Sequence, residues 1–197
     1  NNQEVVMQTN VNSFYSFLDI AKKNHSVIVY ASSAAVYGNL SSPQAIGKES
    51  PENIYGYSKY SMEKIASQYI KENPDMIIVG LRFFNVYGPG EYYKAKTASM
   101  VIQLGHQILS GKAPRLFEGS EKIMRDFIFI DDVIQANIKA CASSTSGVYN
   151  VGTGLPRSFQ DIADILQKEL GTNLGTEYFP NPYDGYQMDT KADITKT

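Results

Sequence analysis

Hydrophobic side chains recur along the N-terminal part of this chain at spacings of three and four residues. This spacing places side chains on one face of an α-helix, and the residues on that face are Val5, Val6, Thr9, Val11, Phe14, Phe17, Leu18 and Ala21. A run of mostly β-branched residues follows at 27–30 (VIVY), which predicts a buried strand. The pattern therefore predicts a helix that leads into a strand.

The same alternation continues along the rest of the chain. Apolar periodicity predicts further helices at 55–71, 97–109, 131–142 and 158–170, the last one capped by Ser158. Short apolar runs predict further strands at 76–81, 115–117, 126–130 and 148–151. A polar stretch rich in Ser, Pro and Gly, about residues 38–53, predicts a loop. This alternation predicts an α/β fold built on a doubly wound parallel sheet.

One part of such a fold is missing from the sequence. A doubly wound sheet that binds a dinucleotide opens with a strand and a glycine-rich turn of the form G-x-G-x-x-G. The nearest match here is Gly152-Thr153-Gly154, with Arg157 at the position of the third glycine. Either this fold binds no dinucleotide, or its N-terminal part lies outside this sequence. After about Gly88 the predicted strands shorten and loops multiply, which predicts a smaller C-terminal lobe.

Composition narrows the classes of function. The chain has 197 residues, of which 43% are hydrophobic and 19% charged, as in globular proteins. Its 20 acidic and 18 basic residues give a net charge of −2, so we expect neither a nucleic-acid nor an anionic-membrane partner. The single cysteine, Cys141, allows no internal disulfide and favours a reducing, cytoplasmic setting. Cys141, His25 and His106 are together too few to form a Cys/His zinc site, so we expect no metal.

A tyrosine followed by a lysine four residues later is the candidate catalytic pair. The helix places the two side by side, so the lysine lowers the pKa of the phenol, which then exchanges a proton with a substrate hydroxyl. The spacing occurs three times, in Tyr55–Lys59, Tyr60–Lys64 and Tyr92–Lys96, and 14 tyrosines make chance matches expected.

Helical phase separates the first two pairs. Tyr55 and Lys59 fall on or inside the apolar arc of the predicted helix, which consists of Met62, Ile65, Ala66, Tyr69 and Ile70. Tyr60 and Lys64 fall on the opposite, solvated side. A lysine on the apolar side is costly without a partner, which favours a functional role for the pair of Tyr55 and Lys59.

Ser33 follows the first predicted strand. Ligands of such sheets bind beyond the carboxyl ends of the strands, where a serine hydroxyl can hydrogen-bond the substrate oxygen that Tyr55 attacks. A turn or helix-capping role is equally open for Ser33 from the sequence.

Three segments in this order resemble the extended short-chain dehydrogenase/reductase family of nucleotide-sugar epimerases and dehydratases. They are residues 33–38 (SAAVYG), 55–59 (YGYSK) and 82–89 (RFFNVYGP), and the resemblance runs from about Thr9 to Ile194. It implies a Rossmann-like fold, with NADP as the cofactor or NAD as the alternative, whose glycine-rich N-terminal segment is absent here. Residues 1–88 would be a partial dinucleotide-binding domain. Residues 89–197 would be mainly a substrate-binding lobe, with about 126–155 returning to the main sheet.

Finer features resemble the branch of that family that acts on ADP-heptose. They are residues 91–94 (EYYK), 116–120 (LFEGS) and 125–127 (RDF). Family dehydratases carry Thr/Ser-Asp-Glu where this chain has Ser33-Ala34-Ala35, which argues against dehydration. The resemblance implies a cytoplasmic homo-oligomer that epimerises its ADP-sugar substrate at C6″ for lipopolysaccharide biosynthesis.

The resemblance also implies a role for individual residues. Tyr55 would be the acid/base and Ser33 its hydrogen-bonding companion, with Lys94 as a second acid/base. Lys59 would tune Tyr55 and hold the nicotinamide ribose. The cofactor would further contact Thr9, Tyr55, Lys94 and the backbone of Val86. The substrate would be lined by Asn85, Lys96, Gln103, Phe117, Glu118, Gly119, Ser120, Arg125 and Tyr186.

Alternatives stay open at this point. Arg125 could fork onto a diphosphate or be a surface residue paired with Asp126 or Glu121. Residues 117–120 could be no more than the exit of a strand into a turn. The protein could be a UDP-hexose 4-epimerase, a non-catalytic dinucleotide-binding regulator or an inactive fragment. The joint presence of Ser33, Tyr55 and Lys59 argues against the regulator.

Overall fold

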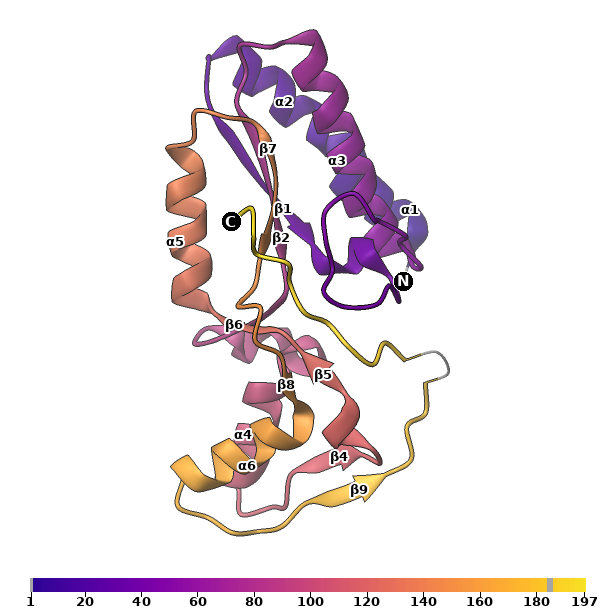
Figure 1. Cartoon of the computed structure of the whole chain (residues 1–197), viewed down its shortest axis with the longest axis vertical. Helices are drawn as coiled ribbons and strands as arrows, with labels where there is room; N and C mark the ends of the chain where they lie inside the picture. The colour runs from indigo at the N-terminus through magenta and orange to yellow at the C-terminus, as the bar shows by residue number, and fades with distance from the viewer. Residues whose placement is uncertain (1, 184–185) are drawn as a thin grey trace.

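Three parallel strands form the central sheet of the computed structural model, which describes residues 2–183 and 186–197, with the backbone alone at Lys96 (Figure 1). The strands lie in the order β1 (Ile28–Ser33), β2 (Ile78–Phe83) and β7 (Gly147–Val151). All pairs are parallel, with Gly80 of β2 opposite Tyr30 and Val148. The predicted α/β fold with a parallel sheet is confirmed.

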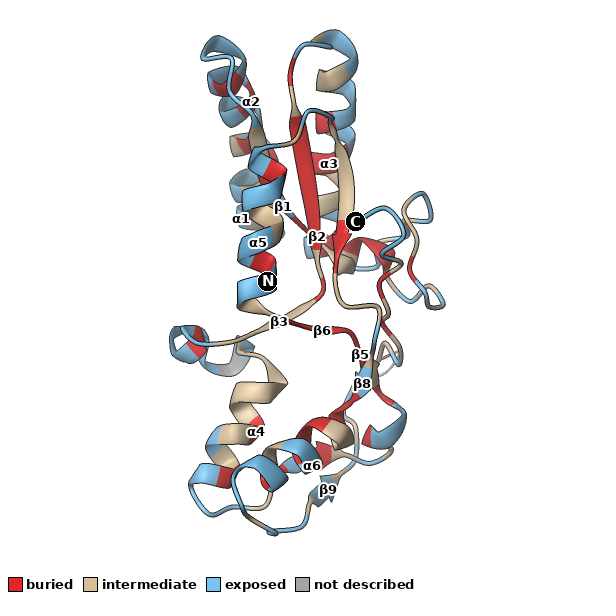
Figure 2. Cartoon of the chain, turned by 60° about the vertical axis from the view of Figure 1, so that its left-hand side comes forward, coloured by how far each residue is buried: buried red, intermediate tan, exposed pale blue. Residues whose placement is uncertain are grey.

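Helices cover both faces of this sheet. The N-terminal helical stretch consists of α1 (Gln3–Met7), the π-helical turn η1 (Gln8–Asn12) and α2 (Ser13–Lys23). Residues from α2 and from α3 (Ile54–Glu72) pack on one face, and the buried cluster there is Phe14, Leu18, Ala21, Tyr30, Met62, Ala66, Met76 and Ile78. On the other face, α5 (Ile130–Cys141) packs against the sheet through Val133 and Ala140. β2 is consequently buried almost throughout (Figure 2).

The second lobe is built on two helices and very short strands (Figure 1). The helices are α4 (Met100–Leu109) and α6 (Phe159–Glu169), whose buried side chains share one core. The strand pairs are β4 (Arg115–Phe117) with β9 (Glu177–Phe179), parallel, and β5 (Met124–Arg125) with β8 (Arg157–Ser158), antiparallel. A parallel pair, β3 (Asn85–Tyr87) and β6 (Phe127–Phe129), lies between the lobe and the main sheet.

The predicted elements recur with shifted ends. β4 begins and ends as predicted, and Ser158 caps α6 in a capping box with Asp161. The helix predicted from residue 97 begins instead at Met100, because Thr97 is the last residue of a separate 3₁₀ turn, η3 (Glu91–Thr97). The pattern missed β3, β5, β8 and β9, which are two or three residues long and too short to show a period.

After β9 the chain returns from the lobe to the main sheet (Figure 1). Asp189 forms a bridge with Met124 and Ala192 one with Gln44. No helix in residues 2–183 and 186–197 is both long and apolar enough to cross a membrane.

Candidate functional site

Ser33 lies at the carboxyl end of β1, where the chain turns into η2 (Ala34–Tyr37). Its Oγ accepts a hydrogen bond of 3.2 Å from the Ala35 amide, so the residue caps this turn. A hydroxyl that accepts a hydrogen bond still has its own proton to donate. The capping role and the predicted substrate role are therefore compatible.

The first turn of α3 packs directly on η2. Asn53 begins the helix, since its side chain accepts the Gly56 amide at 2.9 Å. A Cβ on Gly56 would lie 2.4 Å from the carbonyl oxygen of Ala35, so only glycine allows this approach. The contact brings Tyr55 and Lys59 to the strand end that carries Ser33.

Lys59 is half-buried and lies beside Tyr55. Its Nζ donates to the Ala31 carbonyl at 3.0 Å and lies 5.8 Å from the centre of the Tyr55 ring. Burial lowers the pKa of the Lys59 ammonium group, and no carboxylate pairs with it among the described residues. A partly desolvated lysine held beside a phenol is the arrangement that the Tyr-x-x-x-Lys spacing predicts.

Helical phase was wrong for two tyrosines. Tyr55 is 43% exposed, because the first turn of α3 packs on η2 and extends past the strands. Tyr60 is half-buried against the cluster of Val36 and Tyr37, because η2 also covers that side of the helix. Lys64 is exposed as predicted, with its ammonium 4.7 Å from the Tyr60 ring centre.

The turn that carries Lys94 is η3, which follows β3 beyond the carboxyl end of β2. A buried carboxylate holds this turn in place: Glu91 accepts the Gly88 amide at 3.1 Å and the amide and hydroxyl of Ser99 at 2.7 Å each. Burial raises the pKa of Glu91, but these hydrogen bonds and Lys94 outweigh it, so the pKa is lowered. Lys94 itself is exposed, 3.8 Å from Glu91.

The other predicted cofactor and sugar contacts lie on separate elements. Thr9 is exposed on η1, beside a pocket of about 310 Å³ that is also lined by Tyr30. Asn85 and Val86 lie half-buried on β3, and the backbone amide of Asn85 donates to the backbone carbonyl of Asp126. The side chain of Lys96 lies outside the described residues.

An aromatic pocket of about 450 Å³ lies in the second lobe. Its wall brings together three of the predicted substrate residues, Gln103, Phe117 and Tyr186. The Phe117 and Tyr186 rings meet edge to face, with their centres 5.6 Å apart. The other lining residues are Met100, Gln107, Arg115, Leu116, Phe159, Phe179 and Tyr183. Sequence reasoning missed Phe179 and Tyr183, because β9 and the segment after it carry no periodic pattern.

Arg125 forms part of the structure around this pocket. Its guanidinium donates to the backbone carbonyls of Met124 and Gln187, at 2.8 and 2.5 Å. It also packs on the Tyr186 and Phe159 rings, 5.1 and 5.4 Å from their centres, and burial lowers its pKa. The described residues show no ion pair of Arg125 with Asp126 or Glu121.

Glu118, Gly119 and Ser120 leave β4 as a turn. Glu118 is exposed, and Gly119 has a φ of 77°, in the left-handed region. Ser120 is fully buried, and its hydroxyl has no hydrogen-bond partner among the described residues. The strand-to-turn interpretation therefore describes the local structure, and a substrate role for these residues stays a prediction.

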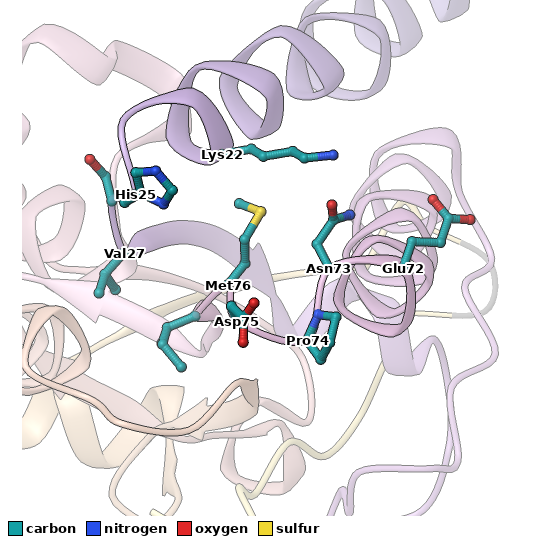
Figure 3. A pocket seen from close by; sticks show the side chains of 10 residues that line it. Lys22, His25, Val27, Glu72, Asn73, Pro74, Asp75 and Met76 are labelled. Carbon is teal, nitrogen blue, oxygen red and sulfur yellow. The ribbon is translucent and has the colours of Figure 1, made fainter.

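A further pocket, of about 310 Å³, lies at the other end of the sheet (Figure 3). It is lined by residues before β1 and β2 and at the ends of α2 and α3, including Lys22, His25, Glu72 and Asp75. None of the predicted site residues lines it. Within the described part of the chain, His, Cys, Asp and Glu nowhere form a group of three that could hold a metal ion.

Comparison with known proteins supplies the family. Residues 1–152 match the model of the NAD dependent epimerase/dehydratase family. The chain is similar to the solved ADP-L-glycero-D-manno-heptose-6-epimerase of Helicobacter pylori, with 47% identity and a TM-score of 0.91. That match covers 99% of this chain and 60% of the H. pylori chain.

UDP-sugar epimerases are similar at lower identity. UDP-glucose 4-epimerase of Thermotoga maritima, solved with UDP-glucose, is 26% identical, with a TM-score of 0.89 and coverage of 99% of this chain and 63% of that one. UDP-glucuronic acid 4-epimerase of Bacillus cereus, solved with NAD, is 28% identical, with a TM-score of 0.79 and coverage of 95% and 59%. This chain thus spans about 60% of the length of these relatives.

Proposed function

Because this chain belongs to the NAD dependent epimerase/dehydratase family, we propose that it provides the acid/base residues and the sugar-nucleotide pocket of an epimerase. The substrate we propose is ADP-glycero-manno-heptose, inverted at C6″. The observation that carries this choice is the 47% identity to the H. pylori ADP-heptose epimerase over 99% of the chain, against 26% and 28% for the two UDP-sugar epimerases.

We propose that the aromatic pocket of the second lobe binds the base of the nucleotide. Flat rings such as Phe117 and Tyr186 provide stacking and apolar surface. Gln103 and Gln107 keep an amide oxygen and an amide nitrogen, respectively, without a partner among the described residues, because their other amide atoms bond the backbone. An acceptor and a donor on the wall of one pocket match the N6 and N7 atoms of adenine. Arg125, next to the pocket, is proposed to contact the diphosphate.

The residues at the end of β1 fit the ribose of a nicotinamide dinucleotide. The Lys59 ammonium group donates one N–H to the Ala31 carbonyl, and its two other N–H groups can donate to ribose hydroxyls. When bound, the dinucleotide supplies the reversible oxidation that lets a sugar carbon invert without net redox change. We propose NADP, with NAD as the alternative. Thr9, the Val86 backbone and Lys94 are the further cofactor contacts we propose.

We propose that Tyr55 moves the substrate proton. Its hydroxyl exchanges a proton with the sugar hydroxyl, and the Lys59 ammonium lies 5.8 Å from the centre of the Tyr55 ring. The Ser33 hydroxyl donates to the same sugar oxygen and holds it at Tyr55. Both side chains act from the same end of the sheet, and Tyr55 is accessible to a ligand.

Inversion requires the sugar to present both faces, so its oxygen occupies two positions. One fixed base serves one position, and a second group must serve the other. We propose Lys94, because η3 carries it on the rim beyond the carboxyl ends of the strands, and Glu91 orders that turn. Asn85, Lys96 and residues 117–120 are proposed to line the sugar and diphosphate.

We further propose residues 1–88 as part of the dinucleotide-binding domain. Residues 89–197 would be mainly the substrate lobe, with about 126–155 in the main sheet. The setting we propose is a cytoplasmic homo-oligomer in lipopolysaccharide biosynthesis.

The test is turnover by the protein expressed at full length. ADP-D-glycero-manno-heptose and UDP-glucose are each supplied with NADP or NAD, and the epimer formed is measured by NMR. We expect inversion of the ADP-heptose. Turnover of UDP-glucose alone would establish the UDP-hexose 4-epimerase instead. Dinucleotide binding without any turnover would establish the non-catalytic regulator.

Two variants test the acid/base residues. We expect Tyr55→Phe and Lys94→Met each to lower epimerisation by about 10²–10⁴-fold, the usual scale of general acid–base catalysis. Tyr57→Phe is the matched control, since Tyr57 lies two residues further along α3 and is 52% exposed. Full activity in Lys94→Met would eliminate Lys94 as the second base.

A further inference from the structure

A row of three buried polar residues crosses the sheet one position before the carboxyl ends of its strands. Ser32 of β1 pairs in register with Arg82 of β2, and Arg82 pairs with Asn150 of β7. Their exposed fractions are 2%, 2% and 0%. Residues in register project from the same face of a sheet, and here it is the face that α3 covers, since Ser32 donates to Glu63 of α3.

Arg82 is the centre of this row and binds three separate segments. Its Nε and Nη2 donate to the Glu63 carboxylate at 2.8 and 2.5 Å. Nη2 also lies 2.6 Å from a carboxylate oxygen of Glu49, in the loop before α3. Nη1 donates to the Tyr37 hydroxyl of η2 at 2.7 Å. One guanidinium thus contacts α3, the loop that leads into it and the turn on which its first residues rest.

The proposed acid/base residues depend on these three segments. Glu63 lies one helical turn after Lys59 on α3. Tyr37 ends the turn that begins after Ser33 and contains Ala35, the residue that Gly56 approaches. Arg82 therefore joins α3 to η2, and its hydrogen bonds and ion pairs are with Glu63, Tyr37 and Glu49 and not with Tyr55 or Lys94.

We propose that Arg82, through its paired contacts with Glu63 and Tyr37, is a positioning residue that sets the first turn of α3 against Ser33. This inference rests on the proposed function for its kinetic consequence, but the positioning itself is a property of the structure. Lysine cannot replace arginine in this role, because a guanidinium is a rigid fork and an ammonium is a point charge.

Stability alone is a weak explanation for such a cluster. The free energy needed to remove charged groups from water is about as large as the free energy gained from their attraction. Buried ion pairs can therefore often be replaced by apolar residues without loss of stability. Two carboxylates around one guanidinium also leave an excess of negative charge among the three groups. Fixed orientation is what the planar, multiply bonded guanidinium adds.

The test compares Arg82→Lys with Ile70→Ala in the full-length protein. Ile70 packs on the core at the far end of α3, so Ile70→Ala destabilises the same helix without touching the cluster. We expect Arg82→Lys to lower kcat about 10- to 100-fold with KM for the nucleotide sugar little changed, since small misplacements of reacting groups cost this much. Ile70→Ala should keep kcat. Equal kcat in the two variants, or a rise in KM alone, would overturn the proposal.

Hydrogen exchange separates this inference from the proposed function. Amides of residues 54–60 should exchange faster in Arg82→Lys than in wild type or Ile70→Ala, whichever substrate the protein turns over. Unchanged exchange there would overturn the positioning role even if epimerase activity is found. If Arg82→Lys does not fold, Ser32→Ala replaces it, since it removes only the hydroxyl that ties Glu63 to β1. We then expect a smaller loss of kcat and faster exchange at 54–60, and wild-type values of both would refute the proposal.

Discussion

Gly56 is the position at which a single methyl group should separate activity from stability. A Cβ there would lie 2.4 Å from the Ala35 carbonyl oxygen and 3.0 Å from the carbonyl carbon. Both contacts are with backbone, which cannot rotate away as a side chain can. Ordinary contact begins near 3.4 Å, so Gly56→Ala must move the first turn of α3 away from η2 by about 1 Å.

The two effects of this change on stability nearly cancel. Alanine is a better helix former than glycine by about 1 kcal/mol, whereas overpacking costs about 1–3 kcal/mol. The net loss of about 0–2 kcal/mol is small beside the roughly 5–15 kcal/mol that hold a typical domain folded. A displacement of about 1 Å in reacting groups, however, can lower a rate about 10²-fold.

We therefore expect Gly56→Ala to remain folded and to lose about two orders of magnitude in kcat. Urea unfolding measures the first quantity and epimerisation of the nucleotide sugar the second, both on the full-length protein. Gly105→Ala is the matched control, because Gly105 lies in the helix α4 with nothing within 4 Å of its added Cβ. That variant should gain up to about 1 kcal/mol and keep kcat.

Wild-type kcat in Gly56→Ala would refute the reasoning. It would mean that the contact between α3 and η2 does not set the position of Tyr55 and Lys59. A fall in kcat that follows a fall in the folded fraction would refute it as well.

Two further predictions concern stability. His25 follows the C-cap residue of α2 and has a φ of 50°, a left-handed conformation that is costly for residues other than glycine. His25→Gly should therefore raise the unfolding free energy by about 0.5–1 kcal/mol and His25→Ala should not; equal values in urea melts of the two variants would contradict this. Burial raises the pKa of Glu49, but the Gly47 amide and Arg82 outweigh it, so the folded-state pKa lies below its usual value. The stability that this carboxylate provides is then present near neutral pH and is lost as pH falls through the folded-state pKa, so Glu49→Gln should flatten the acid limb of stability against pH; an unchanged limb would count against this cause.

Local sequence signals predicted the parts of the fold that are formed by local interactions. The Ser158 cap and the apolar run of β4 each lie within a few residues, and both were located correctly. β5 and β8 could not be predicted, because Met124 pairs with Ser158, 34 positions away, over only two residues on each side. Pairings of this kind depend on how the helices of the lobe pack.

The candidate site shows the same division. Tyr55 and Lys59 share a helix, so their proximity follows from spacing alone. Arg82 is the last but one residue of an apolar strand, and the sequence offers no sign that Glu49 and Glu63 reach it from 33 and 19 positions away, since the packing of α3 decides that contact. Exposure of Tyr55 was likewise set by η2, which the hydrophobic pattern does not describe.

The return of the chain after β9 has a consequence for folding during synthesis. Gln44 exchanges hydrogen bonds with Lys191, 147 residues later, and the buried Asn150 amide donates to both Gln44 and Asp193. At roughly 5–20 residues per second, the ribosome needs on the order of 10 s to make the intervening chain. Throughout that interval the loop that carries Glu49 lacks its partner segment, so the carboxyl end of the sheet stays open, and accessible to a chaperone, until residues 191–193 have been made.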